Sequence, residues 1–371
     1  MDRIKQSHIP HIPISGPTGT YTVRRFQPRD ALGVTECLRE TYGDSYPVTG
    51  LYDPRLVVEQ NMSGRHLGAV AVSDRTGEVV GHCSVQCRFP WPVGECGQIM
   101  VKRGHQGRSL AVRMGQFLEQ EALGIGLRCL VTYEVTSHKA TQLIAHRAKF
   151  RPCGLILGAM PATLDFRNMT GAVSQRESCM VSMKYLLPPQ PATVHVPAHH
   201  QDMIARIFAG LGKPVVFQNP SSVAGPGEIL VRESQTWETA DIVVRRFGEN
   251  SPRAIRVHLQ DLLARGIAEA IYLELPLDQG GGDVVCREAE EAGFFFAGLG
   301  PSSTTEGEVL ILQYMKPELD LSWLRGGTPM GREILRYVTW EQERVFAKCP
   351  SDANEPDTTI VNAGGEPRST E

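Results

Sequence analysis

The proline-rich segment LLPPQPATVHVP, residues 186–197, divides the 371-residue chain into two halves. Its four prolines and its lack of a helical period predict a connection that is neither a helix nor a central strand. The chain length is about that of two ordinary domains. We therefore expect one domain at residues 21–188 and a second at residues 198–345.

Hydrophobic periodicity in the first half predicts an α/β fold, a mixed sheet with helices packed on it. In the stretch 109–126, apolar residues recur three and four positions apart, which is typical of an amphipathic helix. The run LRCLVTYEV (127–135) is nearly continuously apolar and predicts a buried strand. The predicted order is strand, helix, three strands, helix, strand, helix and two strands.

The second half repeats the end of this order, with helix, strand, helix, strand and strand. EEAGFFFAGLG (290–300) parallels HRAKFRPCGLILG (146–158), which favours an internal repeat. We expect Phe294–Phe296 in the core of a second sheet, with a partner-docking patch as the alternative. DQGGGD (278–283) is interpreted as a flexible turn, because acids flank it and no basic residue is close.

The composition excludes several classes of protein. The net charge of −3 does not indicate a binder of nucleic acid or of anionic membranes, and no uncharged apolar run is long enough to cross a bilayer. Nine cysteines occur singly without a CxxC pair, which favours the reducing cytoplasm. Residues 1–20 are predicted to be a flexible arm, and residues 349–371 a disordered tail.

The stretch VKRGHQGRSLAVRMG (101–115) ends a predicted strand and begins a predicted helix. Main-chain N–H groups at a helix start lack partners, and the helix dipole adds positive charge there, so this loop can hold a phosphate. Gly104 and Gly107 permit close approach, and Ser109 is a candidate N-cap. Positive charge comes from Lys102, Arg103 and Arg108. A solvated basic turn is the alternative, because neither GxxxxGK[ST] nor GxGxxG is present.

This loop and its flanking elements resemble the central motif of the GNAT N-acetyltransferase superfamily. That signature is Arg or Gln, two residues, Gly, one residue, and Gly or Ala. Here it reads Gln106-Gly107-Arg108-Ser109-Leu110-Ala111, with Ser109 where the family usually has glycine. VTYEVTSHKATQLIAHRAKF (131–150) resembles the family's next strand, helix start and "GF" ending. The resemblance covers about residues 21–188, and it implies a GNAT fold, with the second half as a probable tandem, degenerate copy.

The resemblance implies a site for acetyl-CoA, the acyl donor. The loop would hold the pyrophosphate, the preceding strand would pair with the pantetheine arm through backbone groups, and His138 stands where the family often has an asparagine. The implied cofactor-binding residues are Ile99, Met100, Val101, Gln106, Gly107, Arg108, Ser109, Leu110, Ala111 and His138.

Acetyl transfer to an amine requires a base that collects the amine proton. Glu95 matches a glutamate that many members of the family use, although a surface position at a strand start is the alternative. The family's frequent acid, a tyrosine, corresponds to Ala145 here, and its neighbour His146 would point elsewhere because one residue turns a helix by about 100°. Tyr133 and Cys129 are weaker candidates, since core positions suit both.

The histidines His195, His199 and His200 imitate part of a metal site. No cysteine is close to them in the sequence. We therefore interpret HVPAHH as the start of a helix after the domain boundary and expect no bound metal.

Taken together, we expect a cytoplasmic N-acetyltransferase, an acyltransferase that works by direct transfer in a ternary complex with an amine acceptor. The loop YGDSYPVTGLYD (42–53) is expected to line the acceptor pocket. The second half lacks the cofactor loop and is expected to close a substrate cleft. Its C-terminal part resembles that of bacterial proteins in which a GNAT domain is joined to a kinase module of the anti-sigma type, which makes a regulatory protein partner possible. The alternatives are a non-catalytic acyl-CoA-binding regulator and a signalling interaction protein.

Overall fold

The computed structural model describes residues 12–16, 19–44, 46, 48–88, 92–162, 175–218, 223–266, 268–303, 307–315 and 319–347. The prediction of a flexible arm is wrong for part of its length. Strand β1 (Ile12–Gly16) pairs antiparallel with β2 (Gly19–Arg25). It is an edge strand, where a residue without an N–H, such as Pro13, is tolerated. The predicted tail, 349–371, lies outside the described residues.

The other elements of the first half follow the predicted order, with one helix, α2, that the periodicity did not indicate. They are α1 (Ala31–Tyr42), α2 (Pro54–Met62), β3 (His66–Ser73), β4 (Val79–Cys87), β5 (Val93–Val101), α3 (Leu110–Gly124), β6 (Cys129–Val135), α4 (Ala140–Arg147), β7 (Arg151–Met160) and β8 (Glu177–Tyr185).

The second half begins with a small parallel pair, β9 and β10, around helix α5, and ends with the long helix α8. Its elements are β9 (Ala192–Val194), α5 (Ala198–Leu211), β10 (Val215–Phe217), β11 (Glu228–Ser234), β12 (Thr239–Arg246), α6 (Ser251–Arg265), β13 (Ala270–Pro276), α7 (Gly282–Glu291), β14 (Phe295–Pro301), β15 (Glu308–Met315) and α8 (Pro329–Phe346).

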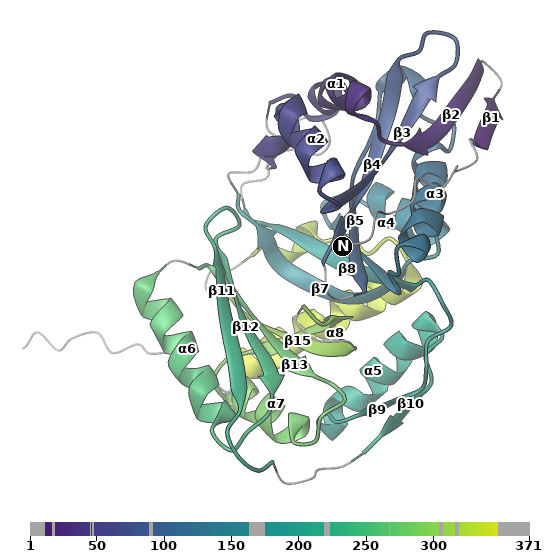
Figure 1. Ribbon diagram of the computed structural model, residues 1–371. Coiled ribbons are helices and arrows are strands. Elements are labelled where there is room, and N and C mark those ends of the chain that lie inside the picture. The colour runs from purple at the N-terminus through teal and green to yellow at the C-terminus, as the bar shows by residue number, and fades with distance from the viewer. Residues whose placement is uncertain are drawn as a thin grey trace, which may run out of the picture.

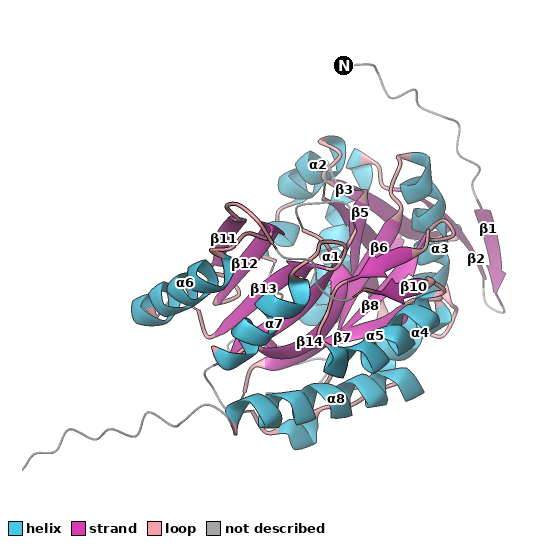
Figure 2. Ribbon diagram, turned by 90° about the horizontal axis from the view of Figure 1, so that it is seen from below, coloured by secondary structure: helices cyan, strands magenta, loops and turns pink. Residues whose placement is uncertain are grey.

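The two halves do not form two separate sheets. All strands except β9 and β10 belong to one sheet of 13 strands, in the order β1-β2-β3-β4-β5-β6-β8-β7-β14-β15-β13-β12-β11. The expectation of a second sheet is therefore wrong, because β7 of the first half pairs antiparallel with β14 of the second. Figures 1 and 2 show this sheet running through both halves, with helices packed against it.

The seam between the halves depends on two glycines. Gly154 of β7 lies opposite Gly298 of β14. A Cβ on Gly154 would lie 2.8 Å from the Ala297 carbonyl oxygen, and a Cβ on Gly298 would overlap the Gly154 backbone. Helices α5 and α8 both pack across β7 and β14. The close approach of these backbones explains why glycine occupies matching places in the two parallel sequences.

The strand arrangement of the first half recurs in the second. β5 runs parallel to β6, and β6, β8 and β7 follow as antiparallel neighbours. In the same way β12 runs parallel to β13, and β13, β15 and β14 follow. The helix exits also match, since Lys149 and Gly293 both have positive φ, at 71° and 100°. The two halves thus share a strand topology, while a tandem, degenerate GNAT-like domain at residues 198–345 stays a prediction.

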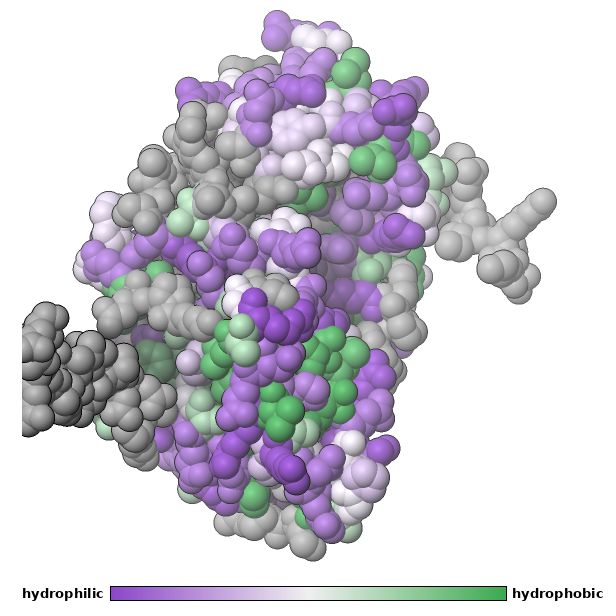
Figure 3. Space-filling model, turned by 90° about the vertical axis from the view of Figure 1, so that its left-hand side faces the viewer, coloured by the Kyte–Doolittle hydropathy of each residue, from purple (hydrophilic) through white to green (hydrophobic). Residues whose placement is uncertain are grey.

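The apolar residues of the second half are mostly inside. Phe294, Phe295 and Phe296 are fully buried, so the alternative of a docking patch at these rings is wrong. On the face of the molecule shown in Figure 3, hydrophobic residues gather mainly over the lower part, which the second half occupies in Figure 1. Within the described residues, no helix is both long and apolar enough to span a membrane.

Candidate functional site

A cavity of about 1480 Å³ opens where β5 and β6 separate. These parallel strands pair only from Val93 to Glu95, opposite Cys129 to Val131. Beyond Glu95, β5 carries a bulge against β4, and Gln98 there has a φ of 55°. A bulge bends its strand and ends regular pairing. The divergence of β5 from β6 therefore creates the cavity.

The predicted phosphate loop forms one end of this cavity. All six residues of the motif, 106–111, line it. Gly107 and Ser109 take left-handed conformations, with φ of 75° and 59°. Within the part of the chain that the structure describes, no carbonyl or side chain accepts a hydrogen bond from the N–H groups of residues 107–111. The loop thus presents a run of free donors at the start of α3.

Two expectations for this loop need correction. The Ser109 side chain does not cap α3, because it makes no hydrogen bond to the first turn of the helix. The Ser109 backbone is left-handed. Lys102 is buried beside Glu78, with the ammonium 2.5 Å from the carboxylate, and it lies outside the cavity lining. That hydrogen bond lowers the pKa of Glu78. Arg103 and Arg108 do line the cavity, and Arg108 donates to the Tyr21 hydroxyl at 2.5 Å.

The strand before the loop contributes alternating side chains. Ile99 and Val101 line the cavity, whereas Met100 faces the opposite side of the sheet and packs with Val34 and Leu38. This alternation is the two-residue period of a strand. The role predicted for Met100 concerns its backbone, so it stays a prediction, but its side chain does not reach the cavity.

The wall formed by the end of β6 and the start of α4 is rich in polar atoms without partners. His138 accepts a hydrogen bond at Nδ1 from the Ala140 N–H at 3.2 Å, and burial lowers its pKa. Buried polar atoms normally have partners, so a group of unpartnered ones indicates a polar ligand or water. Four such atoms belong to residues of this wall, namely Glu134 Oε1, Ser137 Oγ, His138 Nε2 and Thr141 Oγ1.

Glu95 lies in the cavity wall, about one third exposed, and its Oε2 accepts a hydrogen bond from Arg88 at 2.6 Å. Tyr46 of the predicted acceptor loop also lines the cavity. Burial raises the pKa of its hydroxyl, and the nearby Glu95 charge adds to this effect. Tyr42 and Val48 join it there, as the sequence predicted for this loop.

The alternative proton donors differ in whether they line the cavity. Tyr133 lines the cavity, and burial raises its pKa to about 12. Cys129 is buried outside the cavity lining, so its proposed role is wrong. Ala145 faces the cavity, which leaves a methyl group where the family has a tyrosine. His146 is exposed and does not line the cavity.

The sequence analysis missed Glu134 on β6. This carboxyl is buried, accepts a hydrogen bond at Oε2 from the Ser182 hydroxyl at 2.9 Å, and has no hydrogen-bond partner at Oε1. Burial raises its pKa well above the usual range, which favours the protonated form. A lone acid in an apolar strand was the available signal, since such residues are rarely buried without a reason.

The second half supplies the far wall of the same cavity. Arg232 donates to the Ser303 hydroxyl at 2.6 Å and lies 3.6 Å from Asp241 and 3.7 Å from Glu274. Burial raises the pKa of Asp241 and of Glu274. Tyr272 and Trp237 line this side as well. Sequence reasoning could not find these residues, because only the pairing of β7 with β14 brings them opposite Glu95.

Comparison with known proteins agrees with this geometry. A family model described as the acetyltransferase (GNAT) family matches residues 33–148. No curated protein matches the chain.

Solved structures with a similar fold have low sequence identity. The ribosomal-protein-S5-alanine acetyltransferase from Vibrio fischeri has 15% identity, covers 47% of this chain and 96% of its own, and has a TM-score of 0.37. The N-acetyltransferase from Staphylococcus aureus Mu50 has 18% identity, 45% and 99% coverage, and a TM-score of 0.36. A GNAT superfamily phosphinothricin acetyltransferase from Sinorhizobium meliloti, in complex with AcCoA, has 17% identity, 44% and 88% coverage, and a TM-score of 0.36.

The family match spans β4, β5, the loop, α3, β6 and α4, which are the elements that build the cavity from the first half. Residues 33–148 are therefore the part of the chain that is similar to the acetyltransferase (GNAT) family.

Proposed function

We propose that the protein transfers the acetyl group of acetyl-CoA to an amine acceptor that binds in the cavity between the two halves. The observation that carries this proposal is the loop 106–111, whose free N–H groups meet at the open end of the cavity. Such donors at a helix start suit a pyrophosphate. The unpartnered atoms near His138 suit the polar groups of the pantetheine arm.

The acceptor amine must lose a proton before its nitrogen can attack the thioester carbonyl carbon. Glu95 is the proposed base, since its carboxylate lies in the cavity wall and Arg88 fixes its orientation. The C–S bond then breaks, and the leaving sulfur takes a proton. With Ala145 in place of the family's tyrosine, Tyr133 and the protonated Glu134 are the cavity groups that can donate it.

The second half is proposed to recognise the acceptor. Asp241 and Glu274 offer carboxyl groups to a cationic amine, and Arg232 offers a counter-charge to an acidic group on the same molecule. This arrangement favours a small polar acceptor that carries charged or hydroxyl groups in addition to its amine.

The first test is calorimetric titration of the full chain with acetyl-CoA, followed by an assay of thiol release over a panel of amino acids, aminosugars, polyamines and peptide N-termini. We expect saturable 1:1 binding and thiol release with at least one polar amine. Absence of binding at millimolar acetyl-CoA contradicts the proposal.

A second candidate is a regulator that binds acyl-CoA without turnover. The observation in its favour is Ala145, which places no hydroxyl at the usual position of the acid. Tight acetyl-CoA binding without thiol release for any amine of the panel supports this candidate instead.

A further inference from the structure

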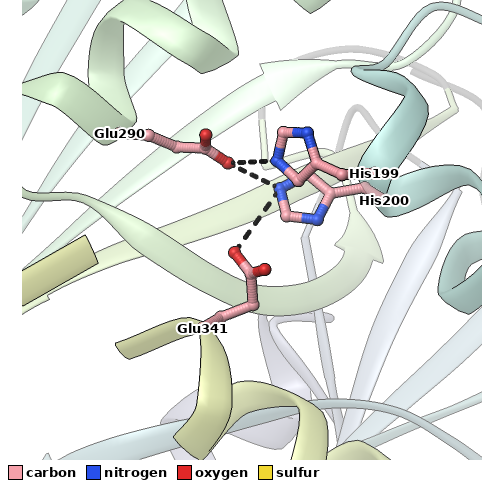
Figure 4. A group of neighbouring side chains, drawn as sticks. All are labelled: His199, His200, Glu290 and Glu341. Carbon is pink, nitrogen blue, oxygen red and sulfur yellow. Dashed lines mark hydrogen bonds and ion pairs between the residues drawn. The ribbon is translucent and has the colours of Figure 1, made fainter. Parts of the chain in front are cut away.

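A second cluster of chemically reactive side chains lies away from the cavity, where α5, α7 and α8 meet (Figure 4). His199 and His200 come from the start of α5, Glu290 from the end of α7 and Glu341 from α8. One nitrogen or oxygen of each residue lies within 4.8 Å of the others. None of the four lines the cavity, so the cluster is independent of the proposed transferase site.

The four side chains converge at short distances. Nε2 of His199 and Nε2 of His200 each lie 2.8 Å from the same oxygen of Glu290, and Nε2 of His200 lies 4.0 Å from Oε2 of Glu341. The His200 and Glu341 side chains are fully buried, that of Glu290 is 8% exposed, and that of His199 is 35% exposed. Only His199 therefore gives solvent a direct route to the cluster.

The Tyr337 hydroxyl supports His200 from the side opposite to Glu290. It lies 2.8 Å from Nδ1 of His200 and 3.1 Å from the His199 carbonyl oxygen. When the hydroxyl proton goes to that carbonyl oxygen, Nδ1 of His200 donates to Tyr337, and Nε2 has a lone pair that can bind a metal ion.

Arg344 shares the carboxylate oxygens that face the histidines. Its guanidinium lies 2.9 Å from Oε1 of Glu290 and 2.6 Å from Oε2 of Glu341. Each carboxylate oxygen accepts more than one partner, so Arg344 can keep its hydrogen bonds while the same carboxylates bind a metal ion.

We propose that His199, His200, Glu290 and Glu341 bind a divalent transition-metal ion, with Zn²⁺ as the best match. Two imidazole nitrogens and two carboxylate oxygens form an N₂O₂ set of the kind that Zn²⁺ takes in tetrahedral sites. In the loaded site Nε2 of each histidine binds the ion, while the Nδ1–H of His200 is hydrogen-bonded to Tyr337 as its supporting contact. The four protein ligands leave no open position, which indicates a structural site.

The position of the cluster explains what a bound ion would do. Helices α5 and α8 pack on β7 and β14, the strands that join the two halves, and α7 packs on β13. A metal there links these helices across the seam. The expectation of no metal is not supported by the fold, because it brings Glu290 and Glu341 to the histidines from 91 and 141 positions beyond His199 and His200 respectively.

The test uses the full chain, stripped with EDTA, kept reduced so that the thiols do not oxidise, and titrated calorimetrically with ZnCl₂. We expect one equivalent of zinc to bind and the melting temperature to rise. His199→Ala and Glu341→Gln should each weaken zinc binding at least about 100-fold. His195→Ala is the matched control, since it removes a nearby histidine outside the cluster.

Both variants are expected to fold, because His199 is partly exposed and glutamine has the size of Glu341. Circular dichroism checks the fold of both. Zinc uptake that is equal in wild type and all variants overturns the proposal, because the cysteines or other residues would then be the ligands. The proposal is also overturned if folded wild-type protein takes up no zinc at about 0.1 mM, because even a weak structural site would bind zinc at that concentration.

Discussion

Two parallel strand pairs occupy matching places in the two halves, but only one of them opens. β5 and β6 pair over three residues and then separate. β12 and β13 pair over five residues, from Thr239 to Val243. Glu95 and Asp241 are both the third residue of their strands, and each has an arginine partner. The repeat has thus kept a carboxylate–arginine pair on both sides of one cavity.

The loops that follow these strands differ more strongly. In the first half, residues 107–111 have free N–H groups within the described structure. In the second half, the chain itself fills the corresponding loop, 247–250. The Glu249 N–H donates to the Gly225 carbonyl, and Asn250 Oδ1 accepts from the Gly227 N–H at 2.8 Å. A Cβ on Gly248 would overlap the backbone of Pro226 and Gly227.

The same strand topology can have two roles, to bind a ligand or to form a stable wall. An open helix start with free donors suits an anionic ligand, whereas a helix start satisfied by its own chain suits a stable wall. Changes in the first half should therefore alter binding and turnover, and changes at the matching positions of the second half should alter stability or acceptor recognition.

The largest expected effect is at the two matching carboxylates. Glu95→Gln keeps the size of the side chain and removes its basicity, so we expect kcat to fall about 100-fold or more, as for loss of a general base. Acetyl-CoA affinity should stay unchanged. The measurement is steady-state thiol release with an amine found by the panel, together with calorimetry.

Asp241→Asn is the matched change in the second half. It should raise KM for the acceptor with a smaller effect on kcat, because Asp241 is proposed to bind and not to accept the proton. If both variants alter kcat equally, the division of roles between the halves is wrong.

The next effect concerns the two loops. In Gly107→Val, the new Cβ meets no protein atom within 4 Å, but it occupies the approach to the free N–H groups, and the φ of 75° strains a residue with a side chain. Loss of one charge-assisted hydrogen bond is worth about 1.5–3 kcal/mol, so acetyl-CoA affinity should fall about 10- to 100-fold.

Asn250→Ala is the control for this loop comparison. It removes the acceptor of the Gly227 N–H and should lower the free energy of unfolding by about 1 kcal/mol. Its acetyl-CoA affinity should equal that of the wild type, and a weaker affinity would mean that the second loop also contributes to ligand binding.

Local patterns in the sequence predicted most of the first half, because amphipathic periodicity and buried apolar runs are local signals. The loop 106–111 and the lining positions Ile99, Val101 and His138 followed from a motif that is contiguous in the sequence. α8 was missed although it is amphipathic and begins with a local start signal, the N-cap Thr328 followed by Pro329.

What local patterns could not predict depends on long-range pairing. The single sheet results from the contact of Gly154 with Gly298, and a glycine in a strand has many possible reasons. The far wall at Arg232 and Asp241, and the group around His200, are consequences of that contact. They consist of residues that are far apart in the sequence but close together in the fold.

A pH-dependent effect distinguishes two buried carboxyls of the cavity, Glu134 and Glu274. Burial raises the pKa of Glu134, so the folded state binds its proton more tightly than the unfolded state. Wild-type stability therefore falls, relative to a Glu134→Gln variant, as the pH rises above the unfolded pKa of about 4.3. The slope of this difference can reach about 1.4 kcal/mol per pH unit.

Urea denaturation of both proteins from pH 5 to pH 8 measures this difference. Glu274→Gln should give a smaller slope, because hydrogen bonds from the Ser303 N–H and hydroxyl stabilise the Glu274 carboxylate and counteract its burial. Equal slopes for the two variants would show that Ser303 does not compensate for burial.

The smallest expected effect lies at Ser109, where the family motif has glycine. Its φ of 59° is a left-handed conformation that costs a residue with a side chain about 1–2 kcal/mol. Ser109→Gly removes this strain but adds entropy to the unfolded chain, worth about 0.5–1 kcal/mol, so a net stabilisation of at most about 1.5 kcal/mol is expected. The serine side chain makes no capping hydrogen bond that the change would lose. Thermal and urea unfolding measure the gain, and calorimetry with acetyl-CoA gives the second readout. Because the backbone already has the conformation that glycine prefers, acetyl-CoA affinity should change less than threefold, roughly 0.6 kcal/mol. A large gain in affinity would mean instead that the serine side chain obstructs the loop, and that the first half binds its ligand less well than its open geometry implies.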